Sequence, residues 1–329
     1  MKRRGNLIEK IADWDNLYEA FRKASRGKRR KAEVKRYAEK LDDNLRELRR
    51  QILSGKVQVG EYRHFTIYEP KERIICAAEF RERVLHHAII NVCHDIFDST
   101  LIDSTYATRR GKGLYAAIEK AVYGMTRYKY TLKLDVRKYY DSIDHEVLKT
   151  LLRSKYKDKK LLGIFDRIID SFDVSDGKGL PIGNLTSQYF ANFYLSTIDH
   201  YAKEVLRVPI YIRYMDDMLM AAEEKDFLRD AERKLGRMVG ERLKLRFKPP
   251  VYRCSNVGQN FLGYKILPYR YELSGRSKRR YRMKLLLYNR MLENEKWSER
   301  EYNEHILPLL AFVSHAVSSN FRKACMDIR

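Results

Sequence analysis

This chain of 329 residues contains few cysteines and lacks a long apolar run. Its four cysteines are widely scattered, and no Cys-x-x-Cys pair occurs. A zinc site or a disulfide framework is therefore not expected, and free thiols in a reducing cytoplasm are the default. No apolar run reaches the 18 residues of a membrane-spanning helix. No apolar core follows the basic N-terminus, which argues against a signal peptide.

Acidic residues are also scarce relative to basic ones. The chain carries 44 Asp and Glu against 67 Lys and Arg, a formal net charge of +23. This excess implies a polyanionic partner, with nucleic acid as the first expectation and an anionic membrane as the second. The 24 tyrosines could stack on bases, although many must belong to the core. A basic cluster at 26–31 is either a solvated helix start or a set of phosphate contacts.

Two common phosphate-binding motifs are missing or unconvincing. No Gly-x-x-x-x-Gly-Lys-Ser/Thr occurs. Gly111-x-Gly113-x-x-Ala116 fits the loose dinucleotide fingerprint, and Asp135 follows it at about the spacing of that motif's acidic residue. However, the two glycines follow an arginine pair instead of an apolar strand, and Asp135 is better explained by a second pattern. The dinucleotide interpretation is therefore rejected.

That second pattern is a set of carboxylates at strand ends. Asp216 and Asp217 lie between two short apolar runs, 209–212 and 218–222, which predicts strand, tight turn and strand. An Asp pair in a turn is usually structural. Here Asp135 ends another expected strand, 131–135, and three carboxylates on neighbouring strand ends suit Mg²⁺. Two such ions can support an in-line phosphoryl transfer.

Hydrophobic periodicity gives a mixed pattern of helices and strands. Asp144 is expected to cap a helix that begins at His145. A hairpin is expected over 62–77, with its turn at 69–72, and a short strand at 245–248. Helices are expected over 7–21, 33–53, 79–96, 114–123, 145–172 (two helices), 189–198 and 226–243, and in two stretches near the C-terminus.

Tyr-Met-Asp-Asp after an apolar strand, with an upstream Leu-Asp-Val-x-x-x-Tyr, resembles the palm of reverse transcriptases. The resemblance implies an α+β right-hand polymerase, with an antiparallel palm sheet backed by helices. The N-terminal extension and fingers would take 1–130, the palm 131–270 (with a fingers-derived segment around 145–185), and a helical thumb 271–329. Two Mg²⁺ would be held by Asp135, Asp216, Asp217 and the carbonyl of Val136.

The same resemblance assigns roles to further residues. A template RNA, a cDNA/RNA hybrid and deoxynucleoside triphosphates would be the ligands, and Tyr140 would exclude a 2′-hydroxyl. Lys248 would protonate pyrophosphate. The nucleotide site would comprise Lys71, Arg73, Tyr139, Tyr140, Ile182, Gly183 and Gln188. Template and primer contacts would comprise Arg109, Tyr214, Met215, Gly263, Arg279 and Arg280, and seven basic residues without an acid in 274–290 would grip the duplex.

One departure narrows the resemblance. Most reverse transcriptases have Gln-Gly-x-x-x-Ser-Pro where this chain has Ile182-Gly-x-x-x-Ser-Gln188. This pattern resembles the enzymes of diversity-generating retroelements, which copy a template RNA mutagenically at adenines in bacterial, phage or archaeal hosts. Ile182 offers no hydrogen bond near the nascent pair, which would weaken nucleotide discrimination. The resemblance covers most of the chain and implies a small, basic, helical accessory variability protein as partner.

Two alternatives remain from the sequence. A group II intron-like or retron enzyme of ordinary fidelity is disfavoured by Ile182 and Gln188, and by the lack of a zinc ribbon, nuclease or maturase segment within the 329 residues. A non-catalytic RNA-binding protein with a vestigial palm is disfavoured because all three carboxylates are present.

Overall fold

The computed structural model describes residues 3–68 and 72–326. The chain divides into two compact units, each built from separate stretches of sequence. Among the described residues, the first unit holds those up to Asp103 together with Val136–Tyr201 and Leu235–Phe247. The second unit holds Ser104–Asp135, Ala202–Lys234 and the residues from Lys248 onward.

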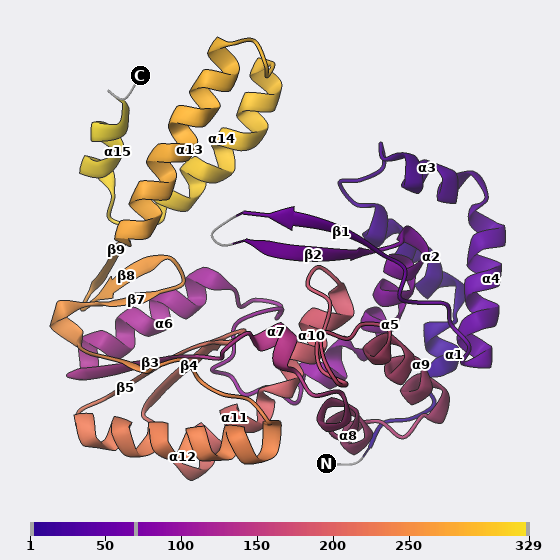
Figure 1. The fold of residues 1–329 in the computed structure, drawn as a ribbon, viewed down its shortest axis with the longest axis horizontal. Helices are drawn as coiled ribbons and strands as arrows, with labels where there is room; N and C mark the ends of the chain where they lie inside the picture. Colours follow the sequence, from indigo (N-terminus) through magenta and orange to yellow (C-terminus); the bar gives the residue numbers. More distant parts are fainter. Residues whose placement is uncertain (1–2, 69–71, 327–329) are drawn as a thin grey trace. The chain divides into compact units, whose positions relative to one another are not determined.

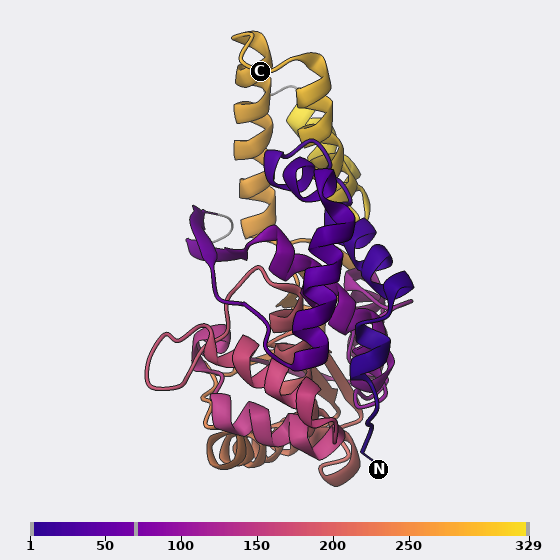
Figure 2. The same cartoon turned by 90° about the vertical axis from the view of Figure 1, so that its right-hand side faces the viewer.

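The first unit is mainly helical and carries one two-stranded hairpin. Its helices are α1 (Ile8–Ile11), α2 (Trp14–Ser25), α3 (Ala32–Glu39), α4 (Leu41–Ser54), α5 (Phe80–Asp98), α7 (Tyr139–Ser142), α8 (His145–Lys155), α9 (Lys159–Asp170), α10 (Leu185–Tyr194) and α11 (Ser196–His200). Its strands β1 (Tyr62–Ile67) and β2 (Arg73–Ala78) pair antiparallel. The N-terminal helices, indigo in Figure 2, pack around α5.

Local caps fix some of the boundaries of the N-terminal helices, which are more numerous than the two that periodicity predicts. The Asp13 side chain accepts hydrogen bonds from the backbone amides of Asp15 and Asn16, so a new helix starts at Trp14. Gly55 ends α4 with a left-handed φ of 72°, a conformation that glycine adopts without strain. Leu17 of α2 and Leu45, Leu48 and Ile52 of α4 are buried, as periodicity predicts, but Trp14 and Tyr18 of α2 are exposed.

The second unit is built on antiparallel sheets. One sheet has the strand order β4 (Ile210–Tyr214), β5 (Asp217–Ala222), β3 (Tyr130–Asp135), β6 (Val251–Cys254), and the other has the order β7 (Gln259–Phe261), β8 (Tyr264–Leu267), β9 (Arg270–Leu273). Its helices are α6 (Leu114–Arg127), α13 (Gly275–Glu293), α14 (Glu299–Ser314) and α15 (Ser319–Met326). Helix α12 (Lys225–Leu243) begins in this unit and ends in the first.

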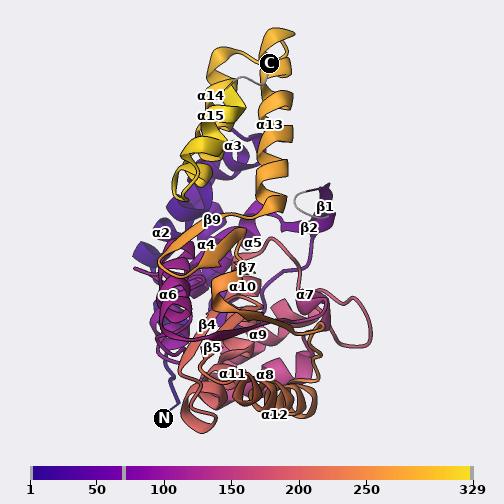
Figure 3. The same cartoon turned by 90° about the vertical axis from the view of Figure 1, so that its left-hand side faces the viewer.

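A single apolar core joins the two sheets of the second unit to α6. Ile118 and Ala121 of α6, Ile212 of β4, Leu219 of β5 and Ile266 of β8 belong to this cluster of buried side chains. Figure 1 shows α6 beside the strands, and Figure 3 shows α13, α14 and α15 grouped together. The four-stranded sheet is therefore held on a packed helix, which makes it a rigid support for side chains at its strand ends.

Most predicted elements are confirmed, and a few are wrong in detail. The Asp144 side chain caps α8 by accepting from the Val147 amide, as expected. The strand predicted at 245–248 does not form, because Phe247 makes only an isolated bridge with Val136. The helix predicted over 189–198 starts earlier, at Leu185, and breaks between α10 and α11. The expected turn at 69–72 lies largely outside the described residues.

The sequence predicts neither a membrane-spanning helix nor a disulfide framework, and the described residues bear on both. None of its helices has both the length and the apolar character needed to cross a bilayer. The four cysteines are free thiols, and three of them are buried. The helices and strands described above make a mixed helix-and-sheet fold, as predicted from the sequence.

Candidate active site

The hairpin β4–β5 presents two of the three predicted carboxylates. Tyr214 pairs with Asp217, so Met215 and Asp216 form a two-residue turn between the strands. Met215 has a φ of 53°, a left-handed conformation that is uncommon for a side chain of its kind. The fully buried Arg213 donates from Nη1 to the Met215 carbonyl at 3.0 Å, which stabilises this turn. The strained turn therefore fixes Asp216 and Asp217 on a rigid support.

The third carboxylate lies on the neighbouring strand. Asp135 is directly opposite Asp217 in the antiparallel register of β3 and β5. Side chains of opposed residues point to the same face of a sheet, and so do those of residues two apart along one strand. Lys133, Asp135 and Asp217 therefore share one face of the second unit. This register is what brings Asp135 close to Asp217, at the ends of neighbouring strands.

The three carboxylates interact electrostatically. Burial and the negative charges of Asp135 and Asp217 together raise the pKa of Asp216 to about 6, while the charge of Lys248 opposes the rise. A group whose ionised form is disfavoured by neighbouring carboxylates gains from a nearby cation. The negative charge of the three carboxylates is therefore only partly offset by the two lysines beside them.

Each of the two facing carboxylates has a lysine of its own. Lys248 Nζ donates a hydrogen bond to Asp135 Oδ1 at 2.7 Å, and the Lys248 amide donates to the Asp135 carbonyl at 2.8 Å. Lys133 Nζ lies 2.9 Å from Asp217 Oδ1. That second contact lacks hydrogen-bond geometry, and Asp217 Oδ1 is a buried acceptor without a hydrogen-bond partner among the described residues.

The fit of these residues to divalent cations can be judged from the donor set. Across residues 3–68 and 72–326, no three His, Cys, Asp or Glu side chains are gathered in a geometry that could hold a metal ion. Asp135 and Asp217 are each paired with an ammonium group, that of Lys248 and that of Lys133. Three carboxylates nevertheless supply the hard oxygen donors that Mg²⁺ prefers. The residues therefore fit the ion.

The predicted nucleotide-site loop is fastened to β2 within the first unit. The Cys76 amide donates to the Ile182 carbonyl at 2.8 Å, and the Ala78 amide donates to Asn184 Oδ1 at 3.2 Å. Between them, Gly183 has a φ of 119°, and a Cβ there would lie 2.8 Å from Ile75 Cγ2. Only glycine allows this close approach of loop and strand. Gln188 follows on α10 and is half-buried.

The two tyrosines after Asp135 differ in burial. Tyr139 is 3% exposed, and its hydroxyl donates to the Ala191 carbonyl. Tyr140 is half-buried and meets the Tyr139 ring edge-on, with ring centroids 5.8 Å apart. Tyr139 is therefore a core residue of the first unit, while part of Tyr140 is accessible.

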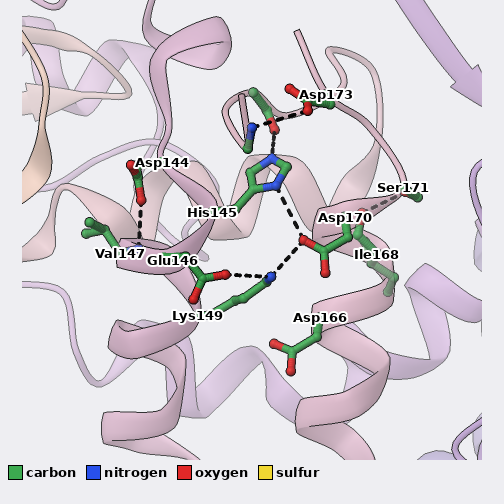
Figure 4. A network of polar contacts seen from close by, with 12 residues as sticks. Asp144, His145, Glu146, Val147, Lys149, Asp166, Ile168, Asp170, Ser171 and Asp173 are labelled. Carbon is green, nitrogen blue, oxygen red and sulfur yellow. Dashed lines mark hydrogen bonds and ion pairs between the residues drawn. The ribbon is translucent and has the colours of Figure 1, made fainter. Parts of the chain in front are cut away.

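A polar network positions the loop that leads to Ile182 (Figure 4). The buried His145 has Nε2 2.8 Å from the Gly179 carbonyl and Nδ1 3.4 Å from Asp170 Oδ1. Lys149 Nζ bridges Asp170 at 2.7 Å and Glu146 at 2.9 Å. These contacts tie α8 and α9 to the end of the loop, so the loop is anchored where it enters the 180–188 segment.

The remaining predicted residues are distributed over both units. Lys71 lies outside the described residues, and Arg73 is exposed at the start of β2. Arg109 Nη1 donates to Thr105 Oγ1 at 3.0 Å within its own loop.

Three predicted template and primer residues lie near the second sheet of the second unit. Gly263 forms the β7–β8 turn with a φ of 89°. Arg280 lies over the Phe312 ring, 5.7 Å from its centroid, and Arg279 is exposed.

A basic pocket in the first unit was missed by the sequence analysis, apart from the charge cluster at 26–31. Its cavity of about 1030 Å³ is lined by the cationic residues Lys28, Lys31, Arg36, Arg63, Arg81 and Arg83, and by three glutamates. Tyr37 and Asn184 also line it, and the Tyr37 hydroxyl and Asn184 Nδ2 are buried without hydrogen-bond partners in the described chain. Burial and the neighbouring Arg83 and Lys31 lower the pKa of Lys28. Such a pocket suits an anionic ligand.

Comparison with known proteins gives the following similarities. Residues 68–266, more than half of the chain, match the family described as reverse transcriptase (RNA-dependent DNA polymerase). Protein YkfC of Escherichia coli (strain K12) is 23% identical over 225 residues, 64% of this chain and 56% of the relative. An uncharacterized 91 kDa protein in the cob intron of Schizosaccharomyces pombe is 22% identical over 162 residues, 47% of this chain and 19% of the relative. The chain thus spans well under two thirds of either relative's length.

Solved structures show the same kind of fold. The apo telomerase from Candida tropicalis aligns with a TM-score of 0.50 and 13% identity, covering 66% of this chain and 49% of that chain. The telomerase from Candida albicans in complex with a TWJ fragment of telomeric RNA aligns with a TM-score of 0.50 and 11% identity, covering 71% and 52%. At this identity the likeness concerns the fold alone.

Proposed function

Because the chain belongs to the reverse transcriptase (RNA-dependent DNA polymerase) family, we propose that it copies an RNA template into DNA by nucleotidyl transfer at Asp135, Asp216 and Asp217. One observation carries the proposal: Asp135 faces Asp217 across β3 and β5, with Asp216 in the adjoining turn. Three carboxylates so arranged are the hard-oxygen ligands that a polymerase needs at its reaction centre.

The chemistry divides between the protein and its ions. Reverse transcriptase domains generally use divalent metals, and bound Mg²⁺ would lower the pKa of the primer 3′-hydroxyl and neutralise the charge of the leaving pyrophosphate. Asp135, Asp216 and Asp217, with the carbonyl of Val136, would hold the ions. Lys248, whose ammonium lies at Asp135, would donate a proton to pyrophosphate.

We propose a division of the chain into fingers, palm and thumb. In this proposal the palm, residues 131–270, contains the four-stranded sheet, and the hairpin β1–β2 belongs to the fingers within 1–130. The helices α13 to α15 form the thumb, 271–329, and present Arg279 and Arg280 to the duplex. Lys71, Arg73, Tyr140, Ile182, Gly183 and Gln188 form the nucleotide site, with Tyr139 packed behind Tyr140.

The nucleic-acid ligand is supported by charge and by the basic pocket. A net charge of +23 favours a polyanion. In the first unit, six cationic side chains line a pocket that also holds unpartnered polar groups of Tyr37 and Asn184. We assign this pocket to RNA phosphates and bases, which cations and aromatic or amide groups together can bind. The free thiols suit the reducing cytoplasm of a bacterial, phage or archaeal host.

A finer proposal is that the enzyme serves a diversity-generating retroelement. It is supported by Ile182 and Gln188, which replace the Gln and Pro usual in the family. Within the first unit, the Cys76 amide of β2 holds the loop by donating to the Ile182 carbonyl, and the Ile182 side chain offers no hydrogen bond to a nascent pair. The proposal ascribes errors opposite template adenine to this loss of discrimination. A small accessory variability protein would act as the partner.

Primer extension tests both levels of the proposal. The wild-type chain, the Asp216→Asn variant and the Ile182→Gln variant are each given an adenine-containing RNA, a DNA primer, Mg²⁺ and four deoxynucleotides, and the cDNA is sequenced. We expect cDNA product only from the two proteins that keep Asp216. The wild-type product should carry errors opposite adenine, and the Ile182→Gln product should carry fewer of them. The accessory protein and native RNA are added in a parallel series.

Each alternative gives a different outcome. Faithful product from the wild type would replace the mutagenic function with that of a group II-like or retron enzyme. Unchanged adenine errors in Ile182→Gln would reject the role of Ile182. Tight RNA binding without synthesis in every series would favour a non-catalytic RNA-binding protein.

A further inference from the structure

Lys133 has a position that the proposed catalytic set does not explain. It lies on β3 two residues before Asp135, and therefore on the same face of the sheet. Its cross-strand partner in the register is Leu219, which makes Asp217 its diagonal neighbour on β5. A lysine is long enough to span such a diagonal. Its Nζ lies 2.9 Å from Asp217 Oδ1, and both side chains are largely buried, at 24% and 29% exposure.

The two lysines at the carboxylates are held differently. Lys248 is fixed to Asp135 by a side-chain hydrogen bond and by its own backbone amide. Lys133 has only an ion pair with Asp217, without hydrogen-bond geometry, and Asp217 Oδ1 has no hydrogen-bond partner in the described chain. Separation of Lys133 from Asp217 therefore costs less free energy than separation of Lys248 from Asp135. Its flexible side chain can move away without any change in the backbone.

We propose that Lys133 is a built-in counter-ion that stands at the Asp217 end of the carboxylate cluster and is displaced by the entering divalent cation. The inference rests on the proposed function, because it concerns the same metal-binding site. In the metal-free protein, the ammonium offsets repulsion among three carboxylates that would otherwise be forced together. Lys133 is thus a positioning residue: it keeps the site assembled and weakens metal binding.

Simple electrostatics gives the direction of the effect. An ammonium group beside Asp217 repels a divalent cation and competes with it for Asp217 Oδ1. Removal of this charge should tighten metal binding. Without metal, it should lower the stability of the folded protein, because the three carboxylates then repel one another more strongly. Because the pair is partly solvated, we expect a change of about three- to tenfold in affinity, not a larger one.

The test is a direct titration with Mn²⁺, in which free ion is measured by electron paramagnetic resonance without substrate. The variants are Lys133→Gln, Lys133→Arg and Asp217→Asn. Lys129→Gln is the matched control, because this exposed lysine immediately precedes the same strand and its loss changes the net charge equally. Thermal melting without metal is recorded for each protein, so that a folding defect is recognised.

Lys133→Gln should bind Mn²⁺ more tightly than wild type and melt at a lower temperature without metal. Lys133→Arg, which keeps the charge, and Lys129→Gln should bind as wild type does. Equal or weaker Mn²⁺ binding by Lys133→Gln, with binding still lost in Asp217→Asn, would overturn the role of Lys133 and leave the metal site intact. No Mn²⁺ binding by wild type and Lys133→Gln alike would overturn the metal site together with this inference.

Discussion

Asp135 of β3 and Asp217 of β5 face each other directly in an antiparallel register. The turn that precedes Asp217 places Asp216 beside both, so burial and two like charges raise the pKa of Asp216 to about 6. This arrangement costs the protein stability unless cations are present. The lysines at positions 133 and 248 offset part of that cost.

Replacement of Asp216 should separate activity from stability. In Asp216→Asn we expect primer extension with Mg²⁺ to fall by about a thousandfold or more, because one of the three metal ligands is weakened. The melting temperature of the metal-free protein should stay the same or rise, since a repelling charge is removed. Exposed Asp226→Asn serves as the control and should change neither. A lower melting temperature in Asp216→Asn would show that other contacts of Asp216 outweigh the repulsion.

Tyr140 and Tyr139 should give different effects when changed. Tyr140→Ala should raise the incorporation of ribonucleotides relative to deoxynucleotides, because a bulky ring near the sugar is removed. Tyr139→Phe keeps the buried ring and loses only the hydrogen bond to the Ala191 carbonyl. It should lower the free energy of unfolding by about 1 kcal/mol without altering sugar selectivity. Competition between the two nucleotide types in primer extension measures selectivity, and equal ratios in wild type and Tyr140→Ala would rule out the steric role.

The basic pocket can be tested by the salt dependence of RNA binding. Lys28→Gln combined with Lys31→Gln removes two cations that line the cavity. The slope of log affinity against log salt for single-stranded RNA should become shallower by about 1.4, or roughly 0.7 per lost phosphate contact. Arg29→Gln with Arg30→Gln has the same charge change close by but is not part of the lining. Equal slopes for the two double variants would mean that the cluster acts only through its total charge.

His87 should make stability depend on pH. Burial, with added repulsion from His86, Lys23 and Lys28, lowers the pKa of His87 to about 4. In the unfolded chain the pKa of a histidine is about 6.5, so between these two values the unfolded state binds more protons. The stabilising contribution is complete above about pH 6.5 and is lost as the pH falls towards 4.

Urea unfolding at several pH values measures this contribution. His87→Gln should lose less stability than wild type between pH 6.5 and 4, because the titrating group is gone. Exposed His305→Gln should follow the wild-type curve. Parallel curves for wild type and His87→Gln would assign the acid sensitivity to other groups.

Local patterns made much of the fold predictable. The apolar runs on either side of Asp216 and Asp217 specified both strands and a tight turn between them, and Asp144 specified a helix start. The strand predicted at 245–248 failed because a strand also needs a partner, and Phe247 meets only Val136. The start of α10 was missed because its cap position, Asn184, uses its side chain on β2 instead.

The sequence by itself determined the chemistry: an excess of basic charge, three aspartates at strand ends, and a family resemblance in the segments around them. Only the tertiary structure decided which groups neutralise one another and where a ligand can enter. Lys133 meets Asp217, and Lys28 shares a pocket with Asn184, through packing between distant segments. Contacts of that kind depend on register and on the burial of whole elements, which no local pattern encodes.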